Sequence, residues 1–324
     1  MLTRRRLIAL SAASTLAPNI SARGQSSAWP NRSVRLIVPL AAGGPTDTLA
    51  RVLGDGLSKL WGQQVVIENK PGGGTNIANE YVARSEPDGY TALFGTSSLA
   101  TVVSLYHSLG YDPEADLAPV SLVAKFPFFM FVPNSSPAKS VLELIADAKA
   151  HPGKRIMGNP GTGSAPHLTA ELFLQMAKIK MTSVPYRGAA PAFVDLIPGR
   201  IDCYFGSGEL LTYSRSGQVR ALATTGAERS AAEPDLPTIA EAGVPGYAVD
   251  SWQGVFLPAK TPADIITRMS TDITTALAVP AIKGKLAQTA YAAQGSSPQA
   301  LRQWLEADSA KWSAVIKTAD IKID

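Results

Sequence analysis

Strand-like and helix-like segments alternate through residues 34–95, and this alternation constrains the fold more than any other feature of the sequence. VRLIVP (34–39), VVIE (65–68) and YTALFG (90–95) are short apolar runs that predict strands. Between them, apolar residues recur every three or four positions in 46–61, which predicts a helix with one apolar face, and 75–85 predicts a second helix. The order β-α-β-α-β implies parallel strands with helices packed on the faces of the sheet.

A second set of elements follows, beginning with a strand at FFMFVP (128–133) and a helix from Ser140, where Glu143 three residues later completes a capping-box pattern. We expect further strands and helices in the same alternation, with strands at 155–158, 181–186, 201–206 and 219–225 and helices from Ser164 and near 189–197.

The last third of the chain is expected to be helical. Thr261-Pro262 and Ser297-Pro298 each predict an N-cap followed by proline at the first helical position. Apolar residues at helical spacing in the final segment predict a stripe that packs in the core, formed by Leu301, Trp304, Leu305, Trp312, Val315 and Ile316.

A chain of 324 residues exceeds one simple core, so we expect an α/β protein of two lobes. The segment 226–250 is rich in Gly, Pro, Ala and Glu and is expected to connect the lobes, and a second crossover is expected near 118–126. The first lobe is then discontinuous. It comprises 29–123 and 250–324, and the second lobe comprises 124–249.

The N-terminus has the order of an export signal. Arg4, Arg5 and Arg6 precede an apolar run from Leu7 to Leu16, and we expect cleavage after Ala28. The paired arginines in TRRRLI suggest the twin-arginine route, although a general secretory signal has the same charge and apolar order. A membrane anchor is less favoured because the run is short. The folded part is therefore expected in the periplasm.

Charge argues against a nucleic-acid partner. The chain has 30 basic and 26 acidic residues, and removing residues 1–28 takes away four arginines and no acids, which leaves 26 of each. A neutral mature chain lacks the excess of basic residues that nucleic-acid binding requires. The single cysteine, Cys203, excludes an internal disulfide and a cysteine-cluster metal site, and its apolar setting IDCYF predicts an inert strand residue.

Four predicted strands end in glycine-rich turns that lead into helices. They are PLAAGGPTD (39–47), NKPGGGTN (69–76), GNPGTGS (158–164) and PYRGAAP (185–191). Each turn exposes the free N–H groups of a helix's first turn, and glycine lets the backbone approach a ligand closely. Such junctions bind anions, so these turns predict a site for a small carboxylate.

Side chains near these turns have alternative roles. Asp47 is expected to cap N–H groups at its helix start, or else to pair with an amine on a ligand. Arg187 is the one charged residue in these loops that suits a bidentate pair with a carboxylate, and a surface ion pair is the equal alternative. Hydroxyls that can donate into the same cleft are those of Ser97, Ser98, Thr162, Ser164 and Ser207.

Patterns typical of enzymes are missing from the sequence. GTGSAP (161–166) lacks the Gly-Lys-Ser/Thr ending of a phosphate loop, and there is no GxSxG elbow. The histidines His107, His151 and His167 occur in unrelated contexts without metal-ligand spacing. His151 is expected at an exposed helix end, and both His167 and Trp252 are expected to pack rather than to bind. We predict no catalytic residue, no metal and no cofactor.

Taken in order, these segments resemble the substrate-binding proteins of tripartite tricarboxylate transporters, also called the Bordetella uptake gene family. The resemblance covers essentially the whole mature chain. It rests on WPNRSVRLIVPLAAGGPTDTLAR, ENKPGGGTNIA, ARSEPDGYTALFGT, GNPGTGSAPHLTAELF, VPYRGAAPAFVDLIPGRID and LPTIAEAGVPGY followed by SWQGVFLPAKTP. It implies a Venus-flytrap fold of the type II periplasmic binding proteins, with a hinge between the lobes, and delivery of carboxylated solutes to a membrane transporter.

The resemblance also implies which residues hold the ligand. The first two loops grip one carboxylate, partly through ordered water, and the loops of the other lobe select the distal end. The gripping positions are Ala41, Ala42, Gly43, Gly44, Pro45, Thr46, Asp47, Gly73, Gly74, Thr75 and Asn76. The selecting positions are Ser97, Ser98, Thr162, Gly163, Ser164, Arg187, Gly188, Ala189 and Ser207.

The chain departs from the family pattern in two loops. Asn76 to Asn79 stand where a further glycine is common, and Leu40 stands where an aromatic residue is frequent. Both changes bear on which ligand fits and neither removes a backbone donor.

The predicted function is therefore capture of a mono- or dicarboxylate by a monomer, without catalysis. The partner is the membrane part of a tripartite transporter or, alternatively, the outer domain of a sensor kinase. An exported hydrolase of small acids is the less favoured rival, because no organised base accompanies the serines. A scaffolding module is a third class.

Overall fold

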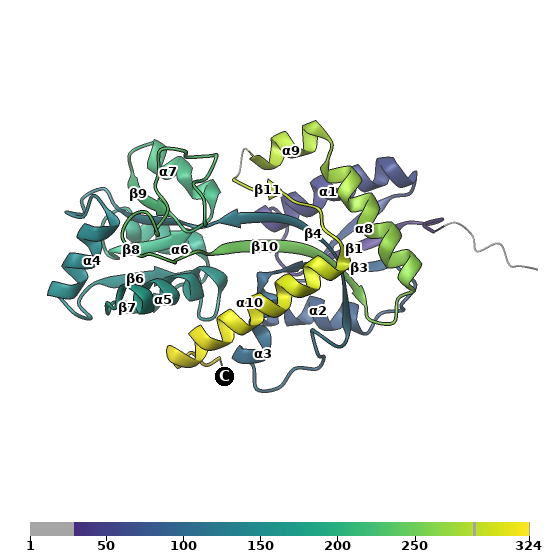
Figure 1. Cartoon of the computed structure of the whole chain (residues 1–324), viewed down its shortest axis with the longest axis horizontal. Helices are drawn as coiled ribbons and strands as arrows, with labels where there is room; N and C mark the ends of the chain where they lie inside the picture. Colours follow the sequence, from purple (N-terminus) through teal and green to yellow (C-terminus); the bar gives the residue numbers. More distant parts are fainter. Residues whose placement is uncertain (1–28, 288–289, 324) are drawn as a thin grey trace, which may run out of the picture.

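The structure, a computed structural model, describes residues 29–287 and 290–323. Its strands form two separate sheets, each flanked by helices, and the two units lie side by side as two lobes (Figure 1). The predicted α/β two-lobed fold is confirmed. The predicted signal falls on residues 1–28, outside the described residues.

The first lobe contains the predicted β-α-β-α-β unit. Strand β1 (Val34–Val38) pairs in parallel with both β2 (Val65–Asn69) and β3 (Thr91–Thr96). Helix α1 (Pro45–Trp61) follows β1, and α2 (Asn76–Ala83) follows β2 through the short helix η1 (Gly73–Thr75). These elements agree with the sequence prediction, and the carboxyl ends of the three parallel strands all reach one edge of the sheet.

The apolar face of α1 explains why this helix packs where it does. Leu49, Leu53 and Leu57 recur at spacings of four and are buried at 3%, 0% and 3% exposure. Burial of a leucine side chain stabilises the fold by roughly 1.5–3 kcal/mol, so this stripe holds α1 firmly on the sheet. The glycine-rich turn before α1 is thereby fixed at the sheet edge.

The second sheet has the strand order β7-β6-β8-β5-β9. Strand β6 pairs in parallel with β7 and β8, whereas β5 is antiparallel to β8 and β9. The strands are β5 (Phe129–Pro133), β6 (Ile156–Asn159), β7 (Thr182–Pro185), β8 (Cys203–Gly206) and β9 (Val219–Thr224), and the helices are α4 (Val141–Ala150), α5 (Ala165–Ala177), α6 (Ala189–Leu196) and α7 (Leu211–Arg215). Each expected element of this set is found.

The capping box at α4 is formed only in part. The Ser140 hydroxyl accepts from the amide of Glu143 at 3.2 Å, as expected. The Glu143 carboxylate accepts from the amide of Lys139 at 2.6 Å instead of that of Ser140. The reciprocal bond is therefore displaced by one residue, yet it still satisfies a free backbone donor at the helix start.

Two long strands carry the chain between the lobes. Strand β4 (Leu117–Pro127) leads into β5 through the single residue Phe128, and β10 (Asp250–Pro258) returns beside β4 in antiparallel pairing along its whole length. Figure 1 shows these two strands running from one lobe into the other. The exact lobe limits, 123/124 and 249/250, stay a prediction.

The segment between β9 and β10 contains no helix and, apart from an isolated bridge between Thr224 and Thr238, no strand. It is the connection that its composition predicts.

The C-terminal part completes the first lobe with helices α8 (Ala263–Leu277), α9 (Pro280–Ala287) and α10 (Pro298–Thr318) and the short strand β11 (Ala292–Ala293). Ser297 caps α10 as predicted, because its hydroxyl accepts from the amide of Ala300 at 3.2 Å. The prediction for Thr261 is wrong. Pro262 is the N-cap of α8, and the Thr261 hydroxyl donates to the carbonyl of Pro258 at 2.7 Å.

Helix α10 packs by its apolar stripe, as predicted. Leu301, Leu305, Trp312, Val315 and Ile316 are buried, and Trp304 packs against them. Trp252 of β10 is fully buried, and its indole N–H donates to Asp308 of α10 at 2.8 Å. This bond joins a crossing strand to the helix that lies along it in Figure 1.

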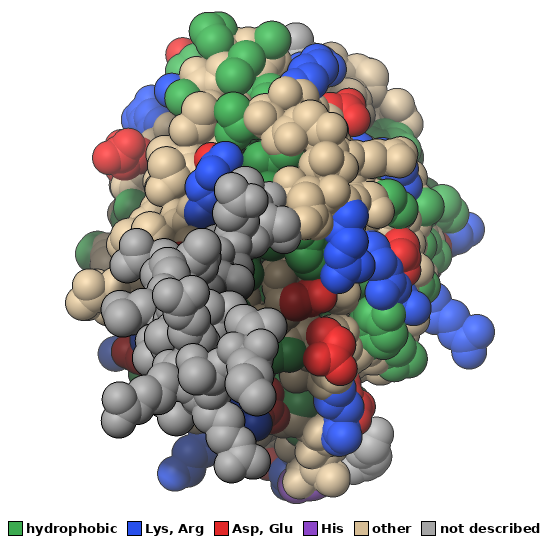
Figure 2. Space-filling model, turned by 90° about the vertical axis from the view of Figure 1, so that its right-hand side faces the viewer, with side chains coloured by type: hydrophobic (Ala, Val, Ile, Leu, Met, Phe, Trp, Pro, Cys, Tyr) green, Lys and Arg blue, Asp and Glu red, His purple; other side chains and the backbone are tan. Residues whose placement is uncertain are grey.

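Charged side chains of both signs lie at the outer end of the first lobe (Figure 2). Figure 2 shows basic and acidic side chains intermixed over the described part of this face. None of the helices among residues 29–287 and 290–323 is long and apolar enough to span a membrane.

Candidate ligand-binding site

A cleft of about 490 Å³ lies between the two lobes and is lined by residues from both. The first lobe contributes the turns that follow β1, β2 and β3, and the second lobe contributes the turns that follow β6 and β8. Ten of the predicted site residues line it: Pro45, Thr46, Gly74, Thr75, Ser97, Ser98, Thr162, Gly163, Ser164 and Ser207. Sequence positions more than a hundred residues apart thus meet in one cavity.

The other ten predicted residues lie beside the lining rather than in it. They are Ala41, Ala42, Gly43, Gly44, Asp47, Gly73, Asn76, Arg187, Gly188 and Ala189. Asn76 illustrates the reason, since its side-chain oxygen accepts from the Tyr111 hydroxyl at 2.9 Å and so faces the lobe interior. Several of these residues shape the turns without touching the cavity.

Arg187 has two expected roles, and the structure bears on one of them. The side chain is exposed, is absent from the cleft lining, and makes no ion pair within the described residues. The prediction of a surface ion pair is therefore wrong in this structure. The bidentate clamp on a ligand stays a prediction.

Asp47 orders the first turn. Its carboxylate is 3% exposed and accepts from the Gly43 amide at 2.9 Å, from Arg51 at 2.9 and 3.0 Å, and from Asn69 at 3.0 Å. The bonds from Arg51 are the largest cause that lowers the pKa of Asp47 to about 2. Protein donors thus occupy both oxygens. The one backbone donor among them, the amide of Gly43, lies just before the N-cap Gly44, so Asp47 orders the turn and caps no first-turn amide of α1. A ligand amine would have to displace one of these donors.

The second turn is held open by glycine. Gly72, Gly73 and Gly74 all have positive φ, at 125°, 57° and 61°. A Cβ on Gly74 would lie 2.0 Å from the hydroxyl oxygen of Tyr106, a cleft residue that follows α3 (Val102–Leu105). Only glycine lets this turn approach the cleft so closely.

Hydroxyl groups form the first-lobe side of the cleft. The Ser98 hydroxyl lies 2.8 Å from that of Thr75 and 2.7 Å from that of Thr96. Ser97 and Ser251 form a second pair at 2.9 Å, at the start of the short helix η2 (Ser97–Ala100). A hydroxyl group can act as donor or as acceptor, so these hydrogen-bonded serine and threonine side chains can adapt to a polar ligand.

On the second lobe, the turn before α5 presents backbone rather than side-chain donors. The Ser164 hydroxyl donates back to the Gly161 carbonyl at 2.6 Å and makes no capping bond. The first-turn amides of α5 therefore lack an intrahelical partner, as is normal at a helix start. His167 is buried and accepts from the Gly163 amide at 3.0 Å, which is the packing role expected of it.

Residues that the sequence did not predict to bind ligand make up much of the wall, among them Leu40 and Trp252. The aromatic and apolar members are Leu40, Val102, Leu105, Tyr106, Phe126, Phe128, Trp252, Tyr291 and Ile323, and the polar members include Thr96, Thr101, Glu209, Ser251 and Gln253. The sequence could have indicated Glu209, because it stands two residues after the predicted site residue Ser207 in the turn that follows β8. Tyr291 and Ile323 carry no local signal, because distant packing brings them to the cleft.

No lysine, arginine or histidine is among the described residues that line the cleft, and Glu209 is the one acidic residue there. An anionic ligand group in this cavity would be held by backbone amides and hydroxyls. Charge-assisted hydrogen bonds from such groups suffice for carboxylate binding.

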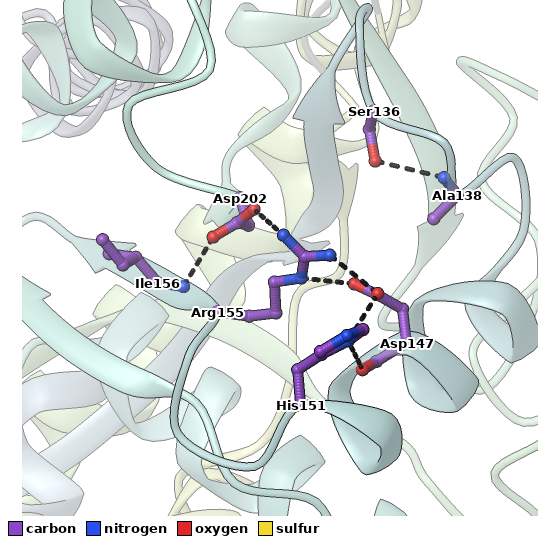
Figure 3. Close-up of polar contacts among 7 residues, drawn as sticks. All are labelled: Ser136, Ala138, Asp147, His151, Arg155, Ile156 and Asp202. Carbon is purple, nitrogen blue, oxygen red and sulfur yellow. Dashed lines mark hydrogen bonds and ion pairs between the residues drawn. The ribbon is translucent and has the colours of Figure 1, made fainter.

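The titratable cluster nearest to catalytic geometry lies elsewhere, on the second lobe. Figure 3 shows Arg155 between Asp147 and Asp202, with N–O distances of 2.5 and 3.5 Å. His151 stands at the exposed end of α4, as predicted, 3.1 Å from Asp147. Asp202 also accepts from the Ile156 amide at 2.7 Å. The cluster fixes the start of β6 and opens on no cleft.

Within the described residues, no group of three or more His, Cys, Asp or Glu side chains could hold a metal ion.

Comparison with known proteins agrees with the two-lobed fold. The profile of the family described as the tripartite tricarboxylate transporter family receptor matches residues 49–321. The chain belongs to this receptor family. Among similar sequences, the receptor is 34% identical to the protein BugT of Bordetella pertussis, over 98% of this chain and 98% of that one.

Solved structures of similar proteins share the whole fold of the receptor. The R. palustris protein Rpa4515 with adipate is 39% identical, with a TM-score of 0.82 over 91% of this chain and 100% of that one. MatC of Rhodopseudomonas palustris with bound malate is 31% identical, with a TM-score of 0.77 over 89% of this chain and 99% of that one.

Proposed function

We propose that this receptor captures a small carboxylate between its two lobes in the periplasm and delivers it to the membrane subunits of a tripartite transporter. The observation that carries the proposal is the interlobe cleft, whose polar lining includes hydroxyls and helix-start amides and, among the described residues, no basic side chain. The adipate and malate found with two similar proteins support a ligand of this class.

One ligand carboxylate is gripped at the first-lobe turns. Thr46 stands in the first turn of α1, and Gly74 and Thr75 stand directly before α2. The amide of Thr46 has no intrahelical acceptor, and the hydroxyls of Thr75 and Ser98 lie beside the second turn. Four or five hydrogen bonds to a charged group, each worth roughly 1.5–3 kcal/mol, support micromolar affinity after the cost of association.

The other end of the ligand is selected by the remaining cleft residues. Thr162, Gly163 and Ser164 come from the turn before α5, and Ser207 comes from the turn after β8. The aromatic residues Phe126, Phe128 and Tyr291 provide an apolar wall around the ligand's middle part. This wall accommodates aliphatic or aromatic carbon skeletons.

Closure of the lobes is the step that a partner protein recognises. The antiparallel strands β4 and β10 lie side by side where the chain passes between the lobes, and a pair of adjacent connections suits hinge motion. Ligand contacts from both lobes favour the closed state. The same closed state would serve the alternative partner, a sensor kinase, and co-purification with transporter membrane subunits or with a kinase outer domain distinguishes the two.

A thermal-shift screen tests the proposal. The purified protein is heated with aliphatic, aromatic and amino carboxylates and with their esters, and products are sought by chromatography. A ligand-dependent rise in Tm with no product is expected, because a ligand that binds only the folded state stabilises it. Turnover of an ester would show the rival hydrolase, and the absence of any shift would favour a scaffolding role.

A further inference from the structure

Glu209 places an unpartnered carboxylate oxygen at the second-lobe side of the cleft. It belongs to the short helix η3 (Gly208–Leu210), which follows β8. The Ser207 hydroxyl donates to Oε1 at 2.5 Å. Oε2 is buried and has no hydrogen-bond partner among the described residues. An ionised carboxylate can only accept hydrogen bonds, so this oxygen requires a donor.

No described residue donates a hydrogen bond to Oε2 of Glu209. No lysine, arginine or histidine is among the described residues that line the cleft. The hydroxyl of Ser207 is already engaged with the other oxygen. Glu209 also lines an adjoining hollow of about 540 Å³ with Gly43, Pro45, Lys285 and Tyr291 of the first lobe, so it faces that lobe across the gap. Lys285 forms no ion pair with Glu209 among the described residues, so Oε2 is open to a donor on a molecule that enters the cleft.

Gln253 is the other polar side chain of the cleft with an unpartnered oxygen among the described residues, but it cannot distinguish a ligand donor from a ligand acceptor. Its side chain is 2% exposed, its Nε2 donates to the Thr46 hydroxyl at 2.7 Å, and its Oε1 is also without a donor. A rotated amide can bond equally well to a hydroxyl, so Gln253 can present either a donor or an acceptor to the cleft. The charge of Glu209 allows no such exchange.

We propose that Glu209 is a specificity-determining residue that selects ligands with a hydrogen-bond donor, an ammonium or hydroxyl group, at the end opposite their carboxylate. This inference rests on the proposed function of the cleft. It assigns the receptor a monocarboxylate bearing such a donor in preference to a plain dicarboxylate. A second carboxylate beside Glu209 would meet a like charge, and no basic residue is among the described residues that line the cleft itself. The donor group instead satisfies the buried oxygen.

Calorimetric titration of length-matched probes tests this assignment. We compare 4-aminobutanoate and 4-hydroxybutanoate with succinate, and 6-aminohexanoate with adipate. The wild-type protein is expected to bind the amino or hydroxy probe at least tenfold more tightly than the matched dicarboxylate. An ammonium preference over hydroxyl would identify a cationic donor, and equal binding of the two would identify a neutral one. A dicarboxylate that binds as tightly or more tightly overturns the proposal.

The variant Glu209→Gln removes the charge and keeps the shape. It is expected to reduce the preference for the amino probe at least tenfold, whereas the control Glu86→Gln, which removes an exposed acid on the first lobe, leaves the preference unchanged. A preference that stays within twofold in the Glu209 variant contradicts the inference. If that variant does not fold, the ratio of wild-type affinities for the amino or hydroxy probe and its matched dicarboxylate tests the inference by itself. Wild-type protein that binds no carboxylate at all would refute the proposed function, whereas dicarboxylate binding alone would refute only the role of Glu209.

Discussion

The hydroxyl oxygen of Tyr106 lies where a side chain on Gly74 would have to begin, since a Cβ built there would be 2.0 Å away. Gly74 belongs to the turn before α2, and Tyr106 follows α3, so the contact joins two elements of the first lobe at the cleft. It explains why the chain has glycine at this position. It also makes the role of the turn testable.

Replacing Gly74 with valine should abolish ligand binding, at least a hundredfold, with the fold retained. The new side chain displaces Tyr106 into the cleft, and the left-handed backbone adds strain of roughly 1 kcal/mol. Affinity is measured by titration calorimetry and folding by circular dichroism. The matched control is Gly73→Ala, which has the same backbone strain but a Cβ 3.4 Å from Ile77. Affinity unchanged by Gly74→Val would remove this turn from the site.

Replacing Asp47 with asparagine should lower the free energy of unfolding by roughly 2 kcal/mol at neutral pH. The pKa of Asp47 is lowered to about 2, below its ordinary value near 3.8, so the charged form stabilises the native state above pH 4. This contribution disappears as the pH falls from 4 to 2. Urea denaturation at several pH values should show a shallower acid dependence for the variant. Asp55→Asn, an exposed acid on the same helix, is the control.

The thiol of Cys203 should not react with a disulfide reagent while the protein is folded. The side chain is fully buried, and burial raises the pKa of the thiol well above its ordinary range. Because the thiolate is the reactive form, labelling with Ellman's reagent at pH 8 should be negligible in buffer and stoichiometric in guanidinium chloride. Rapid labelling of the native protein would contradict the buried strand position.

The indole of Trp252 should anchor the crossing strand β10 to α10. Trp252→Phe keeps an aromatic ring but leaves the buried carboxylate of Asp308 without the donor that lies 2.8 Å away. We expect a loss of about 1–3 kcal/mol in the free energy of unfolding, measured by urea titration. The double variant Trp252→Phe, Asp308→Leu should recover part of it. A single variant as stable as the wild type would show that the bond contributes nothing.

The sequence was sufficient for the fold because its elements depend on local periodicity. The apolar spacing in 46–61 predicts α1, and the alternation around it predicts the parallel unit that β1, β2 and β3 form. The wrong prediction of Thr261 as a helix N-cap also has a local cause. Its hydroxyl bonds to the carbonyl of Pro258, a choice that the pattern Thr-Pro does not reveal.

The site was predictable only where backbone chemistry defines it. Glycine-rich turns identify Gly74 and Gly163 in the lining, since conformational freedom is visible in the residue type. The walls depend on tertiary packing instead. Tyr291 and Ile323 reach the cleft from the C-terminal part of the chain, and Asp47 is engaged by Asn69, which is 22 residues away in sequence. No local pattern encodes such distances.

The most direct test of the account compares one ligand from the thermal-shift screen with its own methyl ester, by titration calorimetry on the wild-type protein. The two molecules differ mainly in the charge of the group that the first-lobe turns are proposed to hold. The account predicts that esterification weakens binding at least a hundredfold, because the charge-assisted hydrogen bonds to the turn amides are lost. An ester that binds as tightly as the acid would contradict carboxylate capture in this cleft.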